Sequence, residues 1–298
     1  MNITFRQLRL FLALADTGSV SSAARKLHIT QPTASMSLKE ITDGVGVPLY
    51  EVVARRVHLT QMGEELAQTA RAISAEWDAF EQHVDGVKGL TRGRLRVAVV
   101  STAKYFIPRI LGTFCTKYPQ IEISLEVLNR DGVVKRLEDN LDDIYIMSQP
   151  PSHLEIEDEV FLSNPLLLIA SVEHRLARKK KIEITDLNAE KFIFREKGSG
   201  TRMSTDAHFK RLKFKPMVRL ELGSNEAIKQ AVMGQLGIAV LSQHSLGDKS
   251  DQREVAILNC NGFPIESSWH IVSPKGKKLS PIAKIFKMHL SSQSKILH

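Results

Sequence analysis

Apolar residues recur every three or four positions in the first 60 residues, which predicts short amphipathic helices. The first helix ends at Gly18, and Ser19 or Ser21 can cap a second helix. Thr30 suits the N-cap of a third helix, because Pro32 then falls in the first turn, where its missing N–H costs nothing. The predicted buried positions of the first two helices are Phe5, Leu8, Phe11, Leu12, Ala15, Ala23, Ala24 and Leu27.

The second and third predicted helices, at about residues 20–39, are joined by a turn of three or four residues. Such a helix pair can place its second helix in the major groove of DNA. We therefore predict a helix-turn-helix within a DNA-binding domain at residues 1–60. The helix positions predicted to face DNA are Gln31, Pro32, Thr33, Ser35, Met36 and Lys39.

Two short extended segments follow these helices and predict a small β-wing. They are Pro48–Glu51 and Val57–Thr60, and they bracket Arg55 and Arg56. Paired arginines at a hairpin tip suit contacts with the minor groove or with phosphates. We include both arginines in the predicted DNA-binding surface.

A narrow apolar stripe runs along the helix predicted at residues 61–90. Its members alternate in spacing between four and three residues, which is a seven-residue repeat, and mostly polar residues lie between them. Either the helix packs on its own domain or it pairs with a second copy of the chain. We favour self-association, because so narrow a stripe suits a partner helix. The predicted dimerisation residues are Leu66, Ala70, Ile73, Trp77, Phe80 and Val84.

From Leu95 onward, predicted strands alternate with predicted helices. Such alternation indicates an α/β fold with a mostly parallel sheet, and about 200 residues suffice for two small lobes with a cleft between them. A buried strand is predicted at residues 94–100, and further strands at residues 121–128, 143–147, 165–171, 192–195, 218–222 and 238–242.

The formal net charge of the 298-residue chain is +8, and it is unevenly placed. The net charge is +3 over residues 1–60, −4 over residues 61–90 and +9 over the remainder. Most of the positive excess therefore lies outside the predicted DNA-binding domain. Two explanations are open for it: a solvated basic surface, or a basic pocket for an anionic ligand.

The sequence predicts no membrane span and no signal peptide. Its longest near-continuous apolar run covers residues 165–172, whereas a span needs about 20 residues. The two cysteines, Cys115 and Cys260, show no metal-ligand spacing. We therefore expect a cytoplasmic protein with two buried thiols, no metal site and no membrane partner.

Three polar segments fall where a predicted strand is followed by a helix: Ser101–Thr102, Gly198–Thr201 and Ser224–Asn225. Ligands of open α/β sheets bind beyond the carboxyl ends of the strands, where helix N-termini offer unpaired N–H groups. The alternative is that each Ser or Thr only caps its own helix. Convergence of all three segments on one cleft favours a ligand.

Basic side chains beside these segments indicate that the ligand is a phosphate or carboxylate. Lys104 and Arg202 are predicted to neutralise it, whereas Arg195 can instead pair with a carboxylate such as Glu196 or Glu221. The predicted effector-binding residues are Ser101, Thr102, Lys104, Gln149, Arg195, Ser199, Thr201, Arg202 and Asn225.

The sequence lacks the patterns that catalysis needs. Its ten histidines form no H-x-x-x-H pair, and the residues around Ser199 lack the G-x-S-x-G spacing of a nucleophile elbow. Asp142 and Asp143 are adjacent, so their side chains point apart on a strand. We therefore predict no catalytic residues and no enzyme activity.

The order of these elements resembles that of LysR-type transcriptional regulators over the whole chain. This resemblance implies a third helix that enters the major groove, a long helix that makes a dimer, and a two-lobed effector-binding domain at residues 91–298 similar to periplasmic binding proteins. On this basis, lobe I covers about residues 91–163 and 267–298, and lobe II about residues 164–266. The motifs that carry the resemblance are Phe5–Leu8, Gly18–Ala24, Thr30–Pro32, Gly46–Tyr50 and Leu59–Gly63.

The effector region is similar to the branch of this family that controls carbon dioxide fixation operons, including the CbbR activators of rubisco operons and regulators of inorganic carbon uptake. Ser148 and Lys197 depart from a glycine and a proline that are common in this branch. The similar motifs are Val100–Phe106, Asp142–Pro151, Arg195–Arg202 and Gly223–Lys229.

This second resemblance implies an activator that binds double-stranded promoter DNA and a small anionic metabolite. Candidate effectors are ribulose bisphosphate, phosphoglycolate, NADPH and 2-oxoglutarate. The family also implies a homodimer, a homotetramer and contact with RNA polymerase.

Two alternative functions follow from the same residues. A LysR-type regulator of another metabolic operon would bind a non-phosphorylated carboxylate. A solute-binding protein or enzyme with an accessory helical domain would bind its ligand without sequence-dependent DNA binding, and it leaves the arginine wing and the seven-residue stripe unexplained.

Overall fold

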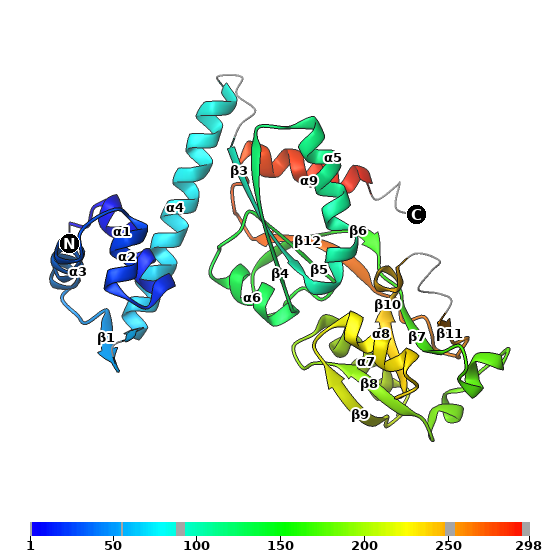
Figure 1. Cartoon of the computed structure of the whole chain (residues 1–298). Coiled ribbons are helices and arrows are strands. Elements are labelled where there is room, and N and C mark those ends of the chain that lie inside the picture. Colours follow the sequence, from blue (N-terminus) through cyan, green and yellow to red (C-terminus); the bar gives the residue numbers. More distant parts are fainter. Residues whose placement is uncertain (1, 55, 88–92, 248–253, 294–298) are drawn as a thin grey trace. The chain divides into compact units, whose positions relative to one another are not determined.

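The computed structural model describes residues 2–54, 56–87, 93–247 and 254–293 (Figure 1). Two compact units make up the chain, one formed mainly by residues up to Val84 and the other mainly by residues from Asp85 onward. None of the helices within these described ranges is both long and apolar enough to cross a membrane.

Three helices form the core of the first unit: α1 (Phe5–Thr17), α2 (Val20–Lys26) and α3 (Gln31–Val45). Each helix begins at a capping side chain that accepts a hydrogen bond from a first-turn N–H, and these caps are Thr4, Ser19 and Thr30. Gly18 ends α1 at a φ of 62°, which glycine adopts without strain. The buried contacts between the helices include Phe11, Leu14, Ala23, Ala34 and Leu38.

A two-stranded wing and a long helix complete this unit. Strands β1 (Tyr50–Val53) and β2 (Arg56–Leu59) pair antiparallel, with Tyr50 opposite Leu59. Helix α4 (Gln61–Val87) begins close to the chain that leads into β1. A Cβ added at Gly63 would lie 1.9 Å from the carbonyl oxygen of Leu49, so glycine allows this close approach. The predicted winged helix-turn-helix is confirmed.

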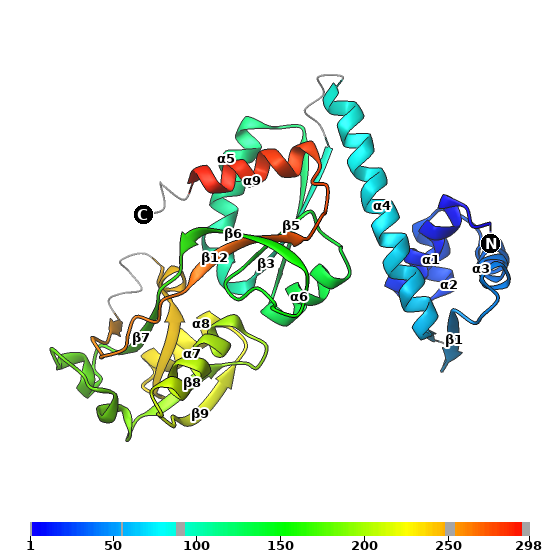
Figure 2. The same cartoon turned by 180° about the vertical axis from the view of Figure 1, so that it is seen from behind.

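Lobe I of the second unit is built on a five-stranded sheet with the order β4-β3-β5-β12-β6. Helices α5 and α9 lie side by side in both views (Figures 1 and 2), and the rings of Phe114 and Phe286 join them at 5.0 Å. Helix α6 contacts β3, β4 and β5. The bounds are β3 (Gly93–Val100), α5 (Ile107–Lys117), β4 (Ile121–Leu128), α6 (Arg130–Glu138), β5 (Ile144–Met147), β6 (Ile156–Ser163), β12 (Ser268–Pro274) and α9 (Pro281–Gln293).

Lobe II is built on a second five-stranded sheet with the order β11-β7-β10-β8-β9. Helix α7 contacts β8 and β10, and helix α8 contacts β7, β8, β9, β10 and β11. The bounds are β7 (Leu166–Ser171), β8 (Lys191–Arg195), α7 (Gly200–Arg211), β9 (Met217–Leu222), α8 (Asn225–Met233), β10 (Ile238–Ser242) and β11 (Val255–Ile257).

The prediction of a mostly parallel sheet is wrong in part, because both sheets are mixed. Strands β3, β4 and β5 run parallel, as do β8, β9 and β10, but β6, β7, β11 and β12 pair antiparallel with their neighbours. The chain passes between the lobes after β6 and again before β12. The sequence pattern did not predict these two strands. Strand β6 is exposed at most positions, with Val160 58 % exposed, so it lacks a buried strand's apolar run. Cys260 is buried as expected, but Cys115 is exposed.

His208 gives lobe II a pH-dependent stability. Its side chain is buried beside Phe263, and its Nε2 has no hydrogen-bond partner among the described residues. Burial and the neighbouring Arg211 lower the pKa of His208 below its ordinary value of 6.5, so the unfolded chain binds the proton more readily than the folded chain does. Stability contributed by the neutral ring is therefore complete above about pH 6.5 and is lost as the pH falls towards the folded-state pKa.

We expect His208→Gln to reduce the loss of melting temperature between pH 7.5 and pH 5.5 relative to the parent chain. Thermal unfolding followed by circular dichroism at both pH values measures this difference. An equal loss in both proteins would contradict the assignment to His208.

Candidate DNA-binding and effector sites

Helix α3 presents its predicted DNA-facing side chains to solvent. Gln31, Pro32, Thr33, Met36 and Lys39 are exposed, and Met36 reaches 62 % exposure. Ser35 is half-buried, and its hydroxyl accepts a hydrogen bond of 2.9 Å from Nε2 of Gln31. The opposite face of α3 is buried through Ala34, Leu38 and Ile41, so one face holds the core and the other is available for DNA.

Basic residues of α1, of the end of α2 and of the turn before α3 were not assigned to the DNA-binding surface from the sequence. Arg6, Arg9, Lys26 and His28 line a groove of about 630 Å³ together with Thr33 and Met36 of α3. Arg6 and Arg9 are three residues apart and lie on the exposed face of α1. This helical spacing could have indicated a basic surface from the sequence. Of the two wing arginines, Arg56 is exposed on β2, and Arg55 lies outside the described residues.

The apolar stripe of α4 divides into a covered and an exposed half. Leu66 packs against the core of the DNA-binding unit, and Ala70 is fully buried. Ile73, Trp77 and Phe80 are 43, 48 and 57 % exposed, although the Trp77 ring also lies 5.7 Å from that of Phe5. Val84 is half-buried. Packing on the helix's own domain therefore accounts for the first half of the stripe, and the second half remains a predicted dimer contact.

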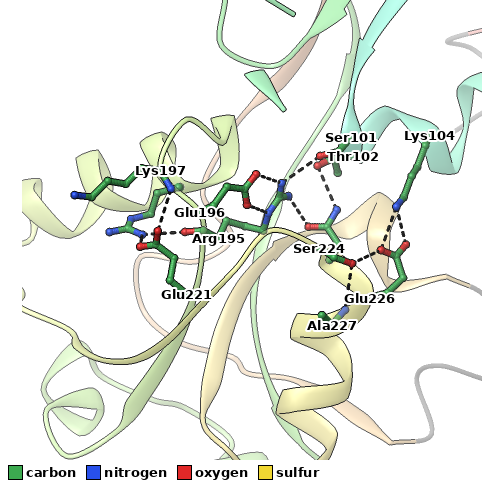
Figure 3. A network of polar contacts seen from close by, with 12 residues as sticks. Ser101, Thr102, Lys104, Arg195, Glu196, Lys197, Glu221, Ser224, Glu226 and Ala227 are labelled. Atoms are coloured by element: carbon green, nitrogen blue, oxygen red, sulfur yellow. Dashed lines mark hydrogen bonds and ion pairs between the residues drawn. The ribbon is translucent and has the colours of Figure 1, made fainter. Parts of the chain in front are cut away.

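Arg195 is the centre of a polar network between the two lobes (Figure 3). It ends β8 and is only 3 % exposed. Its guanidinium forms a bidentate pair with Glu196, at 2.7 and 2.9 Å. It also donates to the Asn225 amide oxygen at 2.7 Å and to the Ser101 hydroxyl of lobe I at 3.1 Å. Of the two roles that the sequence leaves open for Arg195, pairing with a carboxylate is the one observed.

Asn225 and Thr102 extend this network across the lobes. The Asn225 amide donates to the Thr102 hydroxyl at 3.4 Å, and both side chains are buried. Asn225 begins α8, whose N-cap Ser224 accepts from the Ala227 N–H. Both interpretations of the polar segments therefore apply here: Ser224 caps its own helix, while its neighbour reaches the other lobe.

Lys104 and Tyr105 face lobe II from η1 (Ser101–Tyr105), a short 3₁₀ helix that follows β3. Lys104 Nζ donates to the Glu226 carboxylate at 3.1 Å, and the Tyr105 hydroxyl donates to it at 2.5 Å. Burial and the hydrogen bond to Glu226 raise the pKa of Tyr105, so its hydroxyl keeps its proton. Glu226 and Tyr105 were not assigned to the site from the sequence, although both lie in motifs quoted for the family branch.

Arg202 lies on α7 and is turned towards its own lobe. Its guanidinium bonds to Asp206 and Glu221, each at 2.8 Å, and lies 4.6 Å from the centre of the Phe194 ring. It also donates to the carbonyl oxygen of Arg195 at 2.9 Å. Its predicted role as an anion ligand stays a prediction, and it would require release from these two carboxylates.

The remaining predicted site residues lie around the start of α7. The Gln149 amide of lobe I donates to the Ser204 hydroxyl at 3.0 Å. Ser199 is the N-cap residue of α7, but its side chain makes no capping bond, and both Ser199 and Thr201 are buried. The structure thus brings Ser101, Thr102, Arg195 and Asn225 into direct contact, and it places the other predicted residues beside them on both lobes.

The fold defines a class: a winged helix-turn-helix protein with a two-lobed α/β domain of the kind that binds small ligands. Two family models match the chain. Residues 5–64 match the bacterial regulatory helix-turn-helix protein of the lysR family, and residues 88–294 match the LysR substrate binding domain. The chain belongs to the LysR family of transcriptional regulators, and it is a DNA-binding regulator and not an enzyme.

Curated relatives and a solved structure narrow the likeness further. The chain is 44 % identical over 285 residues to the HTH-type transcriptional activator CmpR of Synechocystis sp., covering 96 % of this chain and 94 % of that one. It is 40 % identical over 291 residues to the RuBisCO operon transcriptional regulator of Acidithiobacillus ferrooxidans, covering 98 % and 94 %. The regulatory domain of Synechocystis CcmR in complex with 2-PG is 50 % identical, with a TM-score of 0.65 over 68 % of this chain and 98 % of that domain.

Proposed function

We propose that this chain activates a carbon dioxide fixation operon in response to a small phosphorylated metabolite. The observation that carries the proposal is the buried guanidinium of Arg195, which lies between the lobes beside the N-terminus of α8. A planar donor and the positive end of a helix dipole together suit a phosphate or carboxylate. Relatives named as a transcriptional activator and as a RuBisCO operon regulator support the carbon-fixation role.

2-Phosphoglycolate is the first effector to test. The related CcmR regulatory domain is described in complex with 2-PG, and it shares half of its aligned residues with this chain. Ribulose bisphosphate, NADPH and 2-oxoglutarate are the other candidates. A non-phosphorylated carboxylate as the preferred effector would instead favour a regulator of another metabolic operon.

The assembly that we propose is a homodimer joined through the exposed half of the α4 stripe, with two such dimers forming a tetramer. A dimer presents two copies of α3, as a two-part operator requires. The protein would act in the cytoplasm, where it meets both promoter DNA and RNA polymerase.

Fluorescence anisotropy with the DNA upstream of the chain's own gene tests the proposed function. The full chain should bind this DNA in the presence of competitor, and 2-phosphoglycolate should shift the binding curve. Specific binding that no candidate metabolite shifts would contradict the effector assignment. Absence of specific binding would contradict the assignment of this DNA as an operator of the chain.

The wing makes a separate prediction about salt. If Arg56 neutralises one phosphate, Arg56→Ala should reduce the slope of log affinity against log salt by about 0.9, because one counterion fewer is released. Anisotropy titrations between about 50 and 200 mM salt measure this slope. Arg178→Ala, the same change at an exposed arginine of lobe II, is the control and should leave the slope unchanged. Equal slopes for the parent chain and Arg56→Ala would remove Arg56 from the interface.

A further inference from the structure

Glu226 lies among hydrogen-bond donors of both lobes, and its contacts with Lys104 and Ser224 are drawn in Figure 3. Its carboxylate lies in the first turn of α8 and accepts hydrogen bonds from Lys104 Nζ at 3.1 Å and from the Tyr105 hydroxyl at 2.5 Å. The Ser224 hydroxyl donates a third bond at 2.8 Å. A cation, two hydroxyl donors and a helix N-terminus thus surround a carboxylate that belongs to the protein.

Unlike Glu196 and Glu221, Glu226 has partners in the other lobe. Glu196 pairs with Arg195, and Glu221 pairs with Arg202, both within lobe II. Lys104 and Tyr105 belong to lobe I, so the contacts of Glu226 join the two lobes. The side chain is nevertheless 47 % exposed, which leaves it able to move away.

The charge of this carboxylate persists at every pH at which the protein would be studied. Partial burial opposes its ionisation, but hydrogen bonds from Tyr105, from the backbone, from Ser224 and from Lys104 outweigh burial and hold the pKa of Glu226 at about 2. An incoming anion therefore meets a negative charge among the very donors that it needs.

We propose that Glu226 is a built-in competitor of the effector: the bound anion takes over Lys104 and Tyr105, and Glu226 leaves them. This inference rests on the proposed function, since it concerns the same polar network between the lobes and an anionic effector. Two consequences follow. Effector binding removes contacts between the lobes, and the site favours an anion with more negative charge than the carboxylate it replaces, such as a phosphate dianion over a monocarboxylate.

Neutralising Glu226 should therefore strengthen effector binding. For Glu226→Gln in the full chain, we expect the dissociation constant for 2-phosphoglycolate to fall about tenfold, because a like charge a few ångströms from the anion is removed and Lys104 is released. Isothermal titration calorimetry at fixed ionic strength measures it, and thermal unfolding without ligand verifies that the variant is folded.

Glu159→Gln is a closely matched control. The Glu159 side chain is 46 % exposed and pairs with Lys287 at 3.2 Å, almost the same environment and partner type as Glu226 has, but within lobe I and outside the network. The affinity of Glu159→Gln for 2-phosphoglycolate should stay within about twofold of the parent value, because salt screens the interaction between the anion and a distant exposed charge.

The outcomes separate this inference from the proposed function. If the parent chain binds 2-phosphoglycolate and Glu226→Gln binds it equally or more weakly, Glu226 is a supporting residue and the inference is overturned, while the proposed function stands. Binding by Glu226→Gln alone would support the inference. If neither protein binds 2-phosphoglycolate or inorganic phosphate, the anion site and the inference both fall.

Discussion

Arg195→Met should weaken binding of 2-phosphoglycolate to the full chain by about a hundredfold. Arg195 is nearly fully buried, and its guanidinium bonds to Asn225 and to Ser101 of the other lobe. Its removal deletes charge-assisted hydrogen bonds and leaves the Glu196 carboxylate beside the anion without its bidentate partner. Truncation of one member of such a buried charge pair typically costs roughly 2–5 kcal/mol of binding free energy.

Calorimetric titration of three proteins tests this result. Arg175→Met is the control, because it makes the same charge change in lobe II at an arginine that pairs with Glu190, outside the interlobe network. We expect Arg175→Met to bind like the parent chain. Equal losses in both variants would show a general effect of charge, and parent-like binding by Arg195→Met would remove Arg195 from the effector site.

Phe80→Glu should convert the proposed dimer to monomers and lower the affinity for operator DNA with two half-sites by about a hundredfold or more. Phe80 is 57 % exposed and adjoins the Trp77 ring at 5.8 Å, so the change introduces a carboxylate into the exposed half of the stripe. In a twofold interface the two new charges would be buried near each other without partners. In a dimer, binding of one DNA-binding unit holds the second near its half-site at a millimolar effective concentration. A monomer loses this gain in affinity.

Sedimentation velocity and DNA anisotropy measure these two effects. Gln68→Glu makes a similar addition of charge to α4 at an exposed position about 200° around the helix from Leu66, away from the stripe. This control should remain dimeric and bind DNA normally. A Phe80→Glu protein that is still dimeric would exclude the α4 stripe as the dimer interface.

Local sequence signals were sufficient for the DNA-binding unit. The caps at Ser19 and Thr30 and the left-handed glycine at residue 18 act over a few residues, so the chemistry of each residue settles where α1 ends and where α2 and α3 begin. The spacing of the apolar residues likewise predicted α4. The spacing could not show which residues of the stripe are buried within the unit, because the burial of Ala70 depends on the packing of the other helices.

The polar network between the lobes shows the opposite balance. Sequence motifs placed polar and basic residues at the starts of helices, but Arg195 bonds to Ser101, 94 positions away, and Glu226 bonds to Lys104, 122 positions away. Read locally, Glu226 is simply an acid favoured at a helix N-terminus. Only the folded chain brings it to Lys104 and the Tyr105 hydroxyl of the other lobe.

By itself, the sequence determined the family, the winged helix-turn-helix and several of the residues that meet between the two lobes, because these follow from short-range periodicity, caps and motifs. The tertiary structure decided the mixed direction of the strands, the burial of half the α4 stripe and the pairing of each site cation with a carboxylate. These depend on contacts between residues that are distant along the chain, and the free energy of such contacts is set by packing and desolvation in the folded state.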